Sequence, residues 1–500
     1  MEQISTLQKS IEGGKWTFIN TVFKNLINFA SFLILARFLA PADFGLFTII
    51  FIVPNFMTLV ATTGLETALI QKKEDPIPYL NPLWTLGVLK ALAIFLIIFF
   101  FAPLIADFFN IRQAMTAVRL SGLAVLIGGL SNSAQLFFFK NIDFKKIFIR
   151  DIAGSLAYGA IALTLAVFYK SFWPLFWGVV AQSASSTAST YFLHKFRPRF
   201  SFQFQKFLSL INYSKWIYGQ NLVDRIAPTI ENSLIAKMTG AEKTGLFTKA
   251  KSVSSVPIAP FYNIIDRVAF PSYARIQNSY EKIRDGFVKS LDVLFFLSVP
   301  VAFLFIEASH RLILIFLGEK WIGMNTLLKI ISASFAVSAF SSGALPIFNA
   351  VGKPKIRFWI MLINLSALSI FLFALIPVYG ILGAAITILI TDIIVSLVAV
   401  IMLIKTIAFK LTDAIKSPLI PVIASLIVLA AGRTALKYLE PVADATFIIL
   451  IIFLSALYLI ITMLAGKFLR LGPYATLKLI VSETVFSFKN KNFVTEKISE

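Results

Sequence analysis

The chain carries an internal repeat that limits the folds open to it. Residues 15–48 recur in pattern at residues 215–248, without a gap and with an offset of 200 positions. The matched pairs include Lys15 with Lys215, Trp16 with Trp216, Ala36 with Ala236, Arg37 with Lys237 and Gly45 with Gly245. Both copies are apolar enough to cross a membrane. A membrane protein built from two related halves is typically a transporter, with its substrate site between the halves.

The composition is that of an integral membrane protein. Hydrophobic residues make up 58% of the chain and charged residues only 14%, whereas soluble domains have about 45–50% and about 25%. The chain has no cysteine, which excludes disulfides and thiolate chemistry. Its two histidines lie far apart, so we predict no metal centre and no cofactor, although carboxylates alone could bind an ion. The polar N-terminus runs directly into the first span, so no cleavable signal peptide is expected.

Hydropathy predicts an all-α membrane protein with about 14 spans of about 20 mostly apolar residues each. The spans are expected at roughly residues 16–36, 44–64, 83–105, 117–137, 148–168, 172–193, 213–236, 246–266, 288–307, 325–348, 356–376, 380–404, 417–437 and 445–465. The seventh and eighth are the most polar. The repeat groups the first twelve into two pseudo-symmetric six-helix bundles and leaves two extra C-terminal helices.

The basic residues predict the orientation and the domain boundaries. With the N-terminus in the cytoplasm, inside segments hold about 30 of the 46 Lys and Arg and outside segments about 10. This bias places both termini in the cytoplasm. The predicted parts are an N-terminal lobe with a basic linker (1–210), a C-terminal lobe (211–409), and two helices with a basic tail (410–500). Nucleic-acid binding is disfavoured, because the charges are scattered over many short loops.

Polar residues inside the first span are candidates for a substrate site. Asn20, Lys24 and Asn28 recur at helical spacing and so share one stripe. A charge at the centre of a membrane helix costs roughly 2.5–3.5 kcal/mol on insertion scales, so a retained charge usually faces a watery cavity. The alternative is that Lys24 extends back to the cytoplasmic interface.

The seventh span carries a second polar set, and Asp224 occupies the repeat position of Lys24. Its members are Asn221, Asp224, Arg225 and Glu231. Asp224 and Glu231 are seven residues apart, hence on one face, and are candidates for substrate or ion handling. The alternative is a structural ion pair, either Asp224 with Arg225 or between helices.

The eighth span adds Lys249 and Lys251, which either face the cavity or cap the outer end of their helix. Asp292 and Asp392 are candidates for proton or cation coupling, or else they satisfy neighbouring polar groups. Lys24, Arg225, Lys249 and Lys251 together would form a cationic cavity with acidic counter-charges. Cationic sites suit phosphates and other anions. The chain has no GxxxxGK[ST] motif, so it does not bind ATP through a P-loop.

Residues 35–73 resemble a signature of bacterial polysaccharide transporters. The first part, LARFLAPADFGL at residues 35–46, is similar to the turn after the first helix in that family, and GLETALIQ at residues 64–71 is similar to the end of the second. The turn at residues 349–354 also matches. The resemblance is to the Wzx-like oligosaccharide flippases, especially the colanic acid and teichuronic acid exporters. Their superfamily (MOP) includes multidrug (MATE) exporters and the lipid II flippase MurJ.

The resemblance implies a secondary-type transporter that works by alternating access, not an enzyme. Its substrate would be an oligosaccharide on undecaprenyl pyrophosphate, flipped from the inner to the outer leaflet of the bacterial cytoplasmic membrane for surface polysaccharide synthesis. Proton or sodium coupling would be expected, with a polymerase and glycosyltransferases as partners. The alternatives are a multidrug or lipid II exporter of the same superfamily, or a membrane polysaccharide polymerase or ligase. The short outer loops disfavour an enzyme, and the lysines disfavour cationic drugs.

Overall fold

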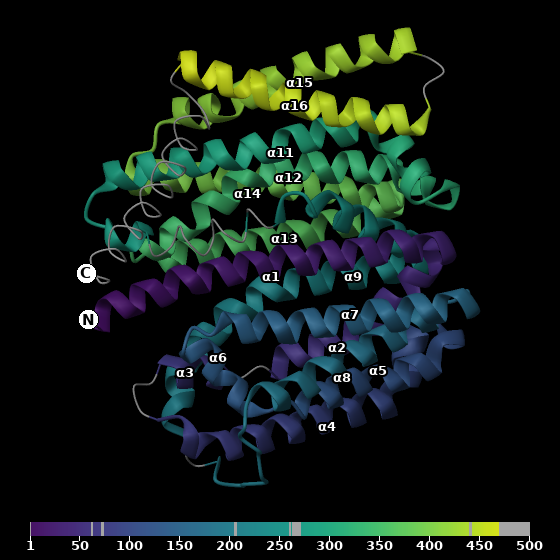
Figure 1. The fold of residues 1–500 in the computed structure, drawn as a ribbon, viewed down its shortest axis with the longest axis vertical. Helices are drawn as coiled ribbons and strands as arrows, with labels where there is room; N and C mark the ends of the chain where they lie inside the picture. Colours follow the sequence, from purple (N-terminus) through teal and green to yellow (C-terminus); the bar gives the residue numbers. More distant parts are fainter. Residues whose placement is uncertain are drawn as a thin grey trace, which may run out of the picture. The chain divides into compact units, whose positions relative to one another are not determined.

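The computed structural model describes residues 2–61, 64–71, 75–204, 208–259, 262, 272–439 and 443–469. The side chains of residues 2–12, 67, 71, 208–225, 413, 438–439 and 469 also lie outside the described part. Within the described residues the chain is helical and has no β-strand (Figure 1). Helices are expected in lipid, because every backbone polar group there must find its hydrogen-bond partner within the protein.

The first part of the chain forms eight α-helices and two short 3-10 turns. These are α1 (Glu2–Phe38), α2 (Pro41–Ala61), α3 (Leu65–Gln71), α4 (Ile77–Phe108), η1 (Arg112–Ala114), α5 (Met115–Gly129), η2 (Ser133–Gln135), α6 (Leu136–Lys140), α7 (Phe144–Phe168) and α8 (Trp173–Leu193). The chain continues with α9 (Leu208–Ser255), α11 (Tyr280–Phe316), η4 (Glu319–Met324), α12 (Asn325–Ala350), α13 (Pro354–Tyr379), α14 (Ile381–Ile407), α15 (Leu411–Leu439) and α16 (Asp444–Leu469).

The helices confirm a multi-pass membrane protein, but not the number of 14 spans. Ten described helices are long and apolar enough to cross a membrane, and an eleventh span is formed if α5 and α6, bent by 66°, count as one. The predicted sixth, seventh and eighth spans are not among them. The sixth is α8, whose residues 183–190 are mostly serine and threonine, and the seventh falls on α9. The eighth begins in α9 and runs into residues 260–261 and 263–266, which lie outside the described part. Polar side chains of this kind lower the hydropathy of a helix below the level typical of a lipid-facing span.

The residues group into two compact units. The first contains residues 1–252, 316–327 and 365–387, and the second contains residues 253–315, 328–364 and 388–500. The division into lobes at residues 210 and 409 stays a prediction.

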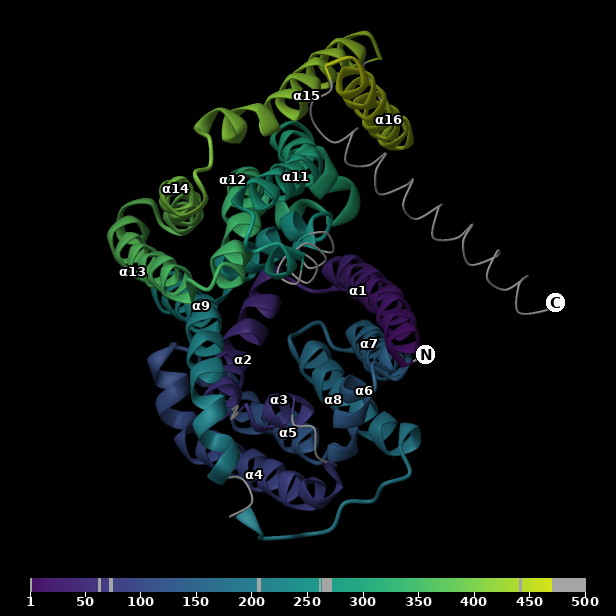
Figure 2. The same ribbon diagram turned by 90° about the vertical axis from the view of Figure 1, so that its left-hand side faces the viewer.

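The first unit is built around α2, α4, α5 and α8. Its core contains Ile49 and Ile50 of α2, Ala106 of α4, Val118 of α5 and Phe176 of α8, all nearly inaccessible to solvent. The helices α1, α7 and α8 also pack in sequence, α1 on α7 and α7 on α8 (Figure 2). Because α1 and α7 lie side by side, polar residues on their facing sides can meet.

The second unit has its core between α11, α12 and α14. Phe287 and Leu291 of α11 pack with Phe348 of α12 and Leu403 of α14, and all four are buried. The last two helices, α15 and α16, pair with each other (Figure 1). They join α11 through a separate cluster in which Tyr458 stacks on Phe296 with ring centroids 5.6 Å apart.

The two repeat copies touch at equivalent glycines in the first unit. A Cβ atom on Gly45 would lie 1.6 Å from the carbonyl oxygen of Ala241, and one on Gly245 would lie 1.9 Å from that of Pro41. Pro41 and Ala241 are themselves repeat partners. The segments therefore cross backbone against backbone, related by a local two-fold axis. Small residues allow such close approach between membrane helices.

Candidate functional site

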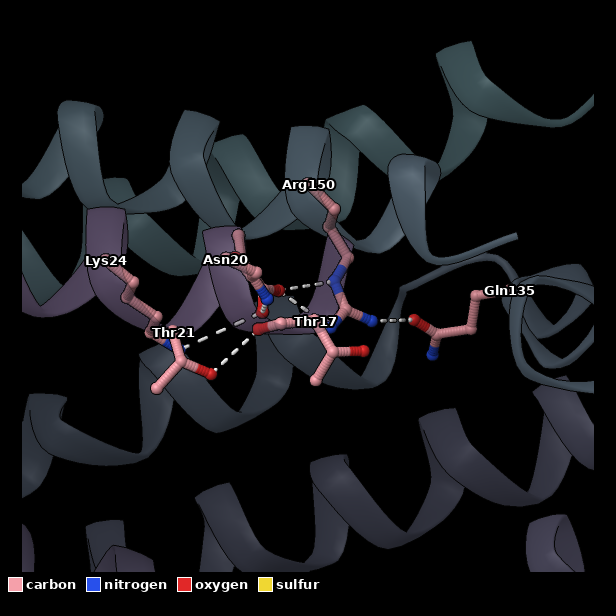
Figure 3. Close-up of polar contacts among 7 residues, drawn as sticks. Thr17, Asn20, Thr21, Lys24, Gln135 and Arg150 are labelled. Carbon is pink, nitrogen blue, oxygen red and sulfur yellow. Dashed lines mark hydrogen bonds and ion pairs between the residues drawn. The ribbon is translucent and has the colours of Figure 1, made fainter. Parts of the chain in front are cut away.

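A cluster of charged and amide side chains lies between α1 and α7 in the first unit (Figure 3). We call it the Asp151 cluster; its members are Asn20, Lys24, Gln135, Arg150 and Asp151. Asn20 and Lys24 lie one turn apart on α1, Arg150 and Asp151 end the second turn of α7, and Gln135 comes from η2. The cluster contains two cations and one anion, so it has a net positive charge.

Asp151 is the centre of the cluster. Arg150 donates to its Oδ1 from Nε at 2.9 Å and from Nη2 at 2.7 Å. Asn20 Nδ2 donates to Oδ2 at 3.1 Å. Arg150 also donates from Nη1 to Gln135 Oε1 at 3.0 Å, which ties η2 to α7. One carboxylate therefore orients side chains from two helices, and charge-assisted hydrogen bonds of this kind are stronger than neutral ones.

Lys24 is the loosest member. Its Nζ lies 4.0 Å from Asp151 Oδ2, beyond hydrogen-bond distance. Its side chain is 40% exposed, against 17% for Asp151. In addition, Asn20 Oδ1 is buried without a hydrogen-bond partner among the described residues. Lys24 can therefore turn toward an incoming anion without breaking a hydrogen bond to Asp151.

The cluster lies about two to three helical turns from the start of two helices long enough to cross a membrane. The membrane-length part of α1 begins at Gly13, so at a rise of 1.5 Å per residue Asn20 and Lys24 lie ~10 and ~16 Å along it. Asp151 lies a similar ~10 Å into α7, which begins at Phe144. Ionisable residues at such depth are costly and usually mark a substrate or ion pathway.

Sequence reasoning found Asn20 and Lys24 but missed their partners. The predicted span 148–168 contains both Arg150 and Asp151. The signal that could have found them is this pair of ionisable residues inside a predicted span. Asn28, two turns beyond Asn20, has no contact with the cluster among the described residues.

The predicted site residues of α9 that the structure describes make two kinds of contact, an ion pair and a cation–π contact. Glu231 and Lys251 form an ion pair with 2.5 Å between Oε1 and Nζ, joining the segments on either side of Gly240. The Glu231 side chain is only 6% exposed. Lys249 lies over two aromatic rings, with its Nζ 4.7 Å from the centroid of Phe44 and 5.0 Å from that of Phe32. The side chains of Asn221, Asp224 and Arg225 lie outside the described residues.

The two remaining acids belong to the second unit. Asp292 is buried on α11, and Asp392 on α14 accepts a hydrogen bond from Ser334 of α12. The described residues contain no group of three or more His, Cys, Asp or Glu side chains that could hold a metal ion. Whether Asp292 or Asp392 couples transport to an ion stays a prediction.

The second unit also contains an apolar pocket of about 400 Å³ between α11, α15 and α16. Side chains that line it include Phe296, Leu304, Val428, Leu454, Ser455 and Leu459. Its charged edge is an ion pair in which Arg433 donates to both carboxylate oxygens of Glu307 at 2.7 Å. An apolar pocket with one polar edge suits a hydrocarbon chain.

The chain is similar to proteins described as acting in the biosynthesis of surface polysaccharides. A family model described as "Polysaccharide biosynthesis protein" matches residues 34–326. The chain is 26% identical over 350 residues to the lipopolysaccharide biosynthesis protein WzxC of Escherichia coli K12, covering 69% of this chain and 70% of that one. It is 23% identical over 359 residues to the teichuronic acid biosynthesis protein TuaB of Bacillus subtilis 168, covering 71% and 74%.

A solved structure of the lipid II flippase MurJ in an inward-closed conformation has the same fold. It superimposes with a TM-score of 0.72, covering 90% of this chain and 99% of that one, at 18% identity. At this identity the likeness concerns the arrangement of helices and not the substrate.

Proposed function

The chain belongs to the polysaccharide biosynthesis protein family, and on this premise we propose that it flips an undecaprenyl-pyrophosphate-linked oligosaccharide across the bacterial cytoplasmic membrane. The family match over residues 34–326 is the observation that carries the proposal. It bears out the expected resemblance to polysaccharide transporters, with a teichuronic acid protein among the relatives. The MurJ-like fold supports a flippase and not an enzyme, because MurJ is itself named as a flippase.

The Asp151 cluster supports a site for the pyrophosphate. Its net positive charge favours an anion, and Lys24 is free to move toward one. Arg150 has its guanidinium already oriented by Asp151 and Gln135. A guanidinium and an ammonium together suit phosphate oxygens. The net charge also disfavours cationic drugs, the usual cargo of the alternative exporter class.

The apolar pocket between α11, α15 and α16 supports a place for part of the undecaprenyl chain. Its volume of about 400 Å³ is within the range of small-molecule sites, so it holds a few prenyl units and not the whole tail. The rest of the tail stays in lipid. We also propose cytoplasmic termini and coupling to protons or sodium ions. The polymerase and glycosyltransferases of the same pathway are the proposed partners.

The deciding experiment locates the lipid-linked oligosaccharide in spheroplasts of a deletion strain, with a glycan-cleaving reagent that acts only from outside. If the protein is a flippase, intact lipid-linked units accumulate out of reach of the reagent, and restoring the gene makes them accessible. Accessible but unpolymerised units in the deletion strain would instead place the protein after translocation and favour a polymerase or ligase.

Replacing Lys24 with alanine is expected to lower export in this assay by about tenfold or more, because a charge-assisted contact to phosphate is typically worth about 1.5–3 kcal/mol. Lys15→Ala is the matched control, since Lys15 is an exposed lysine on the same helix. Both variants should reach the parent protein level in membranes. Full export by Lys24→Ala would remove Lys24 from the proposed site.

Filling the apolar pocket should slow export without affecting folding. Ser455→Trp places an indole in the pocket from α16, where the serine is exposed and lines the cavity. We expect export to fall several-fold, because the indole competes with the prenyl chain for the same apolar volume. Ser455→Ala, which leaves the pocket open, should export like the parent. Equal export by both variants would exclude the pocket from the prenyl path.

A further inference from the structure

Two basic residues at equivalent repeat positions make the same kind of contact. Arg37 near the end of α1 donates from Nε to the carbonyl oxygen of Phe316, the last residue of α11, at 3.1 Å. Lys237 of α9 donates from Nζ to the carbonyl oxygen of Phe108, the last residue of α4, at 2.6 Å. Each cation therefore caps the C-terminus of a helix. The carbonyls at a helix C-terminus lack partners within the helix and carry partial negative charge.

The two caps are related by the repeat and cross between its copies. Among the described helices, α4 is the first of membrane length that begins after the first copy, and α11 is the first that begins after the second copy. The cation of the first copy caps the helix that follows the second copy, and the cation of the second copy caps the helix that follows the first. Both contacts lie within the first compact unit. We call Arg37, Lys237 and the two carbonyls they bind the paired caps.

Residues of η4 make further contacts with the C-terminal end of α1. Trp321 of η4 donates from Nε1 to the Ala36 carbonyl oxygen at 2.9 Å, and Lys320 donates from Nζ to that of Arg37 at 2.8 Å. The Trp321 ring packs on Phe44 with centroids 5.3 Å apart. The Gly45–Gly245 crossing lies in the turns directly after the caps. Ala36 and Ala236, the residues before the capping cations, are 0% and 1% exposed.

We propose that the paired caps form the latch of a gate at the C-terminal ends of α4 and α11. The gate opens only when Arg37 releases α11 and Lys237 releases α4. The proposal rests on the proposed function, because a gate implies a substrate that passes it. Its geometry suits a latch. Both capping contacts are solvent-exposed, and an exposed cation at a helix C-terminus contributes only modestly, so the latch holds the closed state and still releases.

The absence of cysteine from the chain makes the proposal directly testable. A single cysteine replaces Ala236, and its rate of reaction with a membrane-impermeant maleimide is measured from each side of reconstituted vesicles. The parent Ala236→Cys protein should react slowly, because the site is buried. Adding Arg37→Gln and Lys237→Gln should raise the rate about tenfold from one side only, and each single change should raise it about threefold. These factors follow from caps worth about 0.3–1 kcal/mol each.

Three controls make the result specific. Lys170→Cys, at an exposed position before α8, sets the rate for an open site. Arg112→Gln removes an exposed cation from η1 that pairs with Asp107, five residues away. This change should leave the labelling rate of Ala236→Cys unchanged. The exchange Arg37→Lys with Lys237→Arg keeps both donors and should label like the parent. It also shows whether changes at these positions are tolerated by the fold.

The proposal is overturned if the double glutamine variant labels no faster than Arg112→Gln, or if the parent already labels at the rate of Lys170→Cys. If the double variant does not purify as a monodisperse protein, the single changes decide in its place, and unchanged labelling in both rejects the latch. The labelling needs no substrate. Faster labelling together with full export by Lys24→Ala would keep the gate and reject the pyrophosphate site.

Discussion

Replacing Gly45 with alanine is expected to destabilise the purified protein by about 3 kcal/mol, the upper part of the range for an overpacked core. The added methyl group would lie 1.6 Å from the Ala241 carbonyl oxygen, which is backbone and cannot turn aside. Gly245→Ala should behave in the same way, since its methyl group would lie 1.9 Å from the Pro41 carbonyl oxygen. Thermal unfolding in detergent micelles measures both effects.

Two other glycines provide matched controls. A Cβ atom on Gly14 of α1 or Gly128 of α5 would meet no atom within 4 Å. Alanine at these helical positions should leave stability unchanged or raise it by up to about 1 kcal/mol, because alanine favours the helix. If Gly45→Ala unfolded at the same temperature as Gly14→Ala, the backbone crossing between the repeat copies would not exist in the folded protein.

Removing the partner of Glu231 is expected to have the second large effect. Lys251→Met leaves a carboxylate that is only 6% exposed without its cation. Breaking a buried pair in this way costs about 3–5 kcal/mol, and since the Lys251 side chain is 35% exposed we expect about 2–3 kcal/mol after solvent screening. The double variant Glu231→Gln with Lys251→Met should recover most of this loss, because no charge is then left unpaired.

The measurement is a double-mutant cycle of unfolding free energies in micelles. A coupling energy of about 1.5 kcal/mol or more would confirm a pair that holds the two segments of α9 together across Gly240. Lys243→Met is the control, because Lys243 is an exposed lysine of the same segment and should tolerate the change. Strictly additive losses in the cycle would mean that Glu231 and Lys251 act independently, and would return Lys251 to the set of free cations for substrate binding.

The Asp151 cluster and the paired caps divide the cationic residues into two roles. Lys24 and Arg150 lie in the span, around an acid that orients them. Arg37 and Lys237 lie at helix ends and bind backbone carbonyls. The sequence pattern predicts that Lys24, Arg225, Lys249 and Lys251 share one cavity. The structure pairs Lys251 with Glu231 and places Lys249 on the rings of Phe32 and Phe44.

Composition and local sequence pattern were enough to predict the membrane environment, the helical fold class, the repeat and the family. Each of these depends on composition or on local pattern: apolar segments must become helices in lipid, and the Gly-Leu-Phe-Thr segments recur with a fixed offset. The number of 14 spans, predicted from the same patterns, is not confirmed, because α8 and α9 are more polar than the ten described helices that are apolar enough to cross a membrane.

Which charged side chains contact one another depends on how distant helices pack. Asp151 lies 131 positions from Asn20, and Phe316 lies 279 positions from Arg37. Helical periodicity reports the face of one helix, but not which neighbour covers that face. The partners of Lys24, Lys249 and Lys251 therefore depended on packing between helices distant in the chain, or between segments of one helix joined at Gly240. Among the described residues, that packing places Lys24 in a polar cluster, pairs Lys251 with a buried acid, and sets Arg37 and Lys237 at helix C-termini.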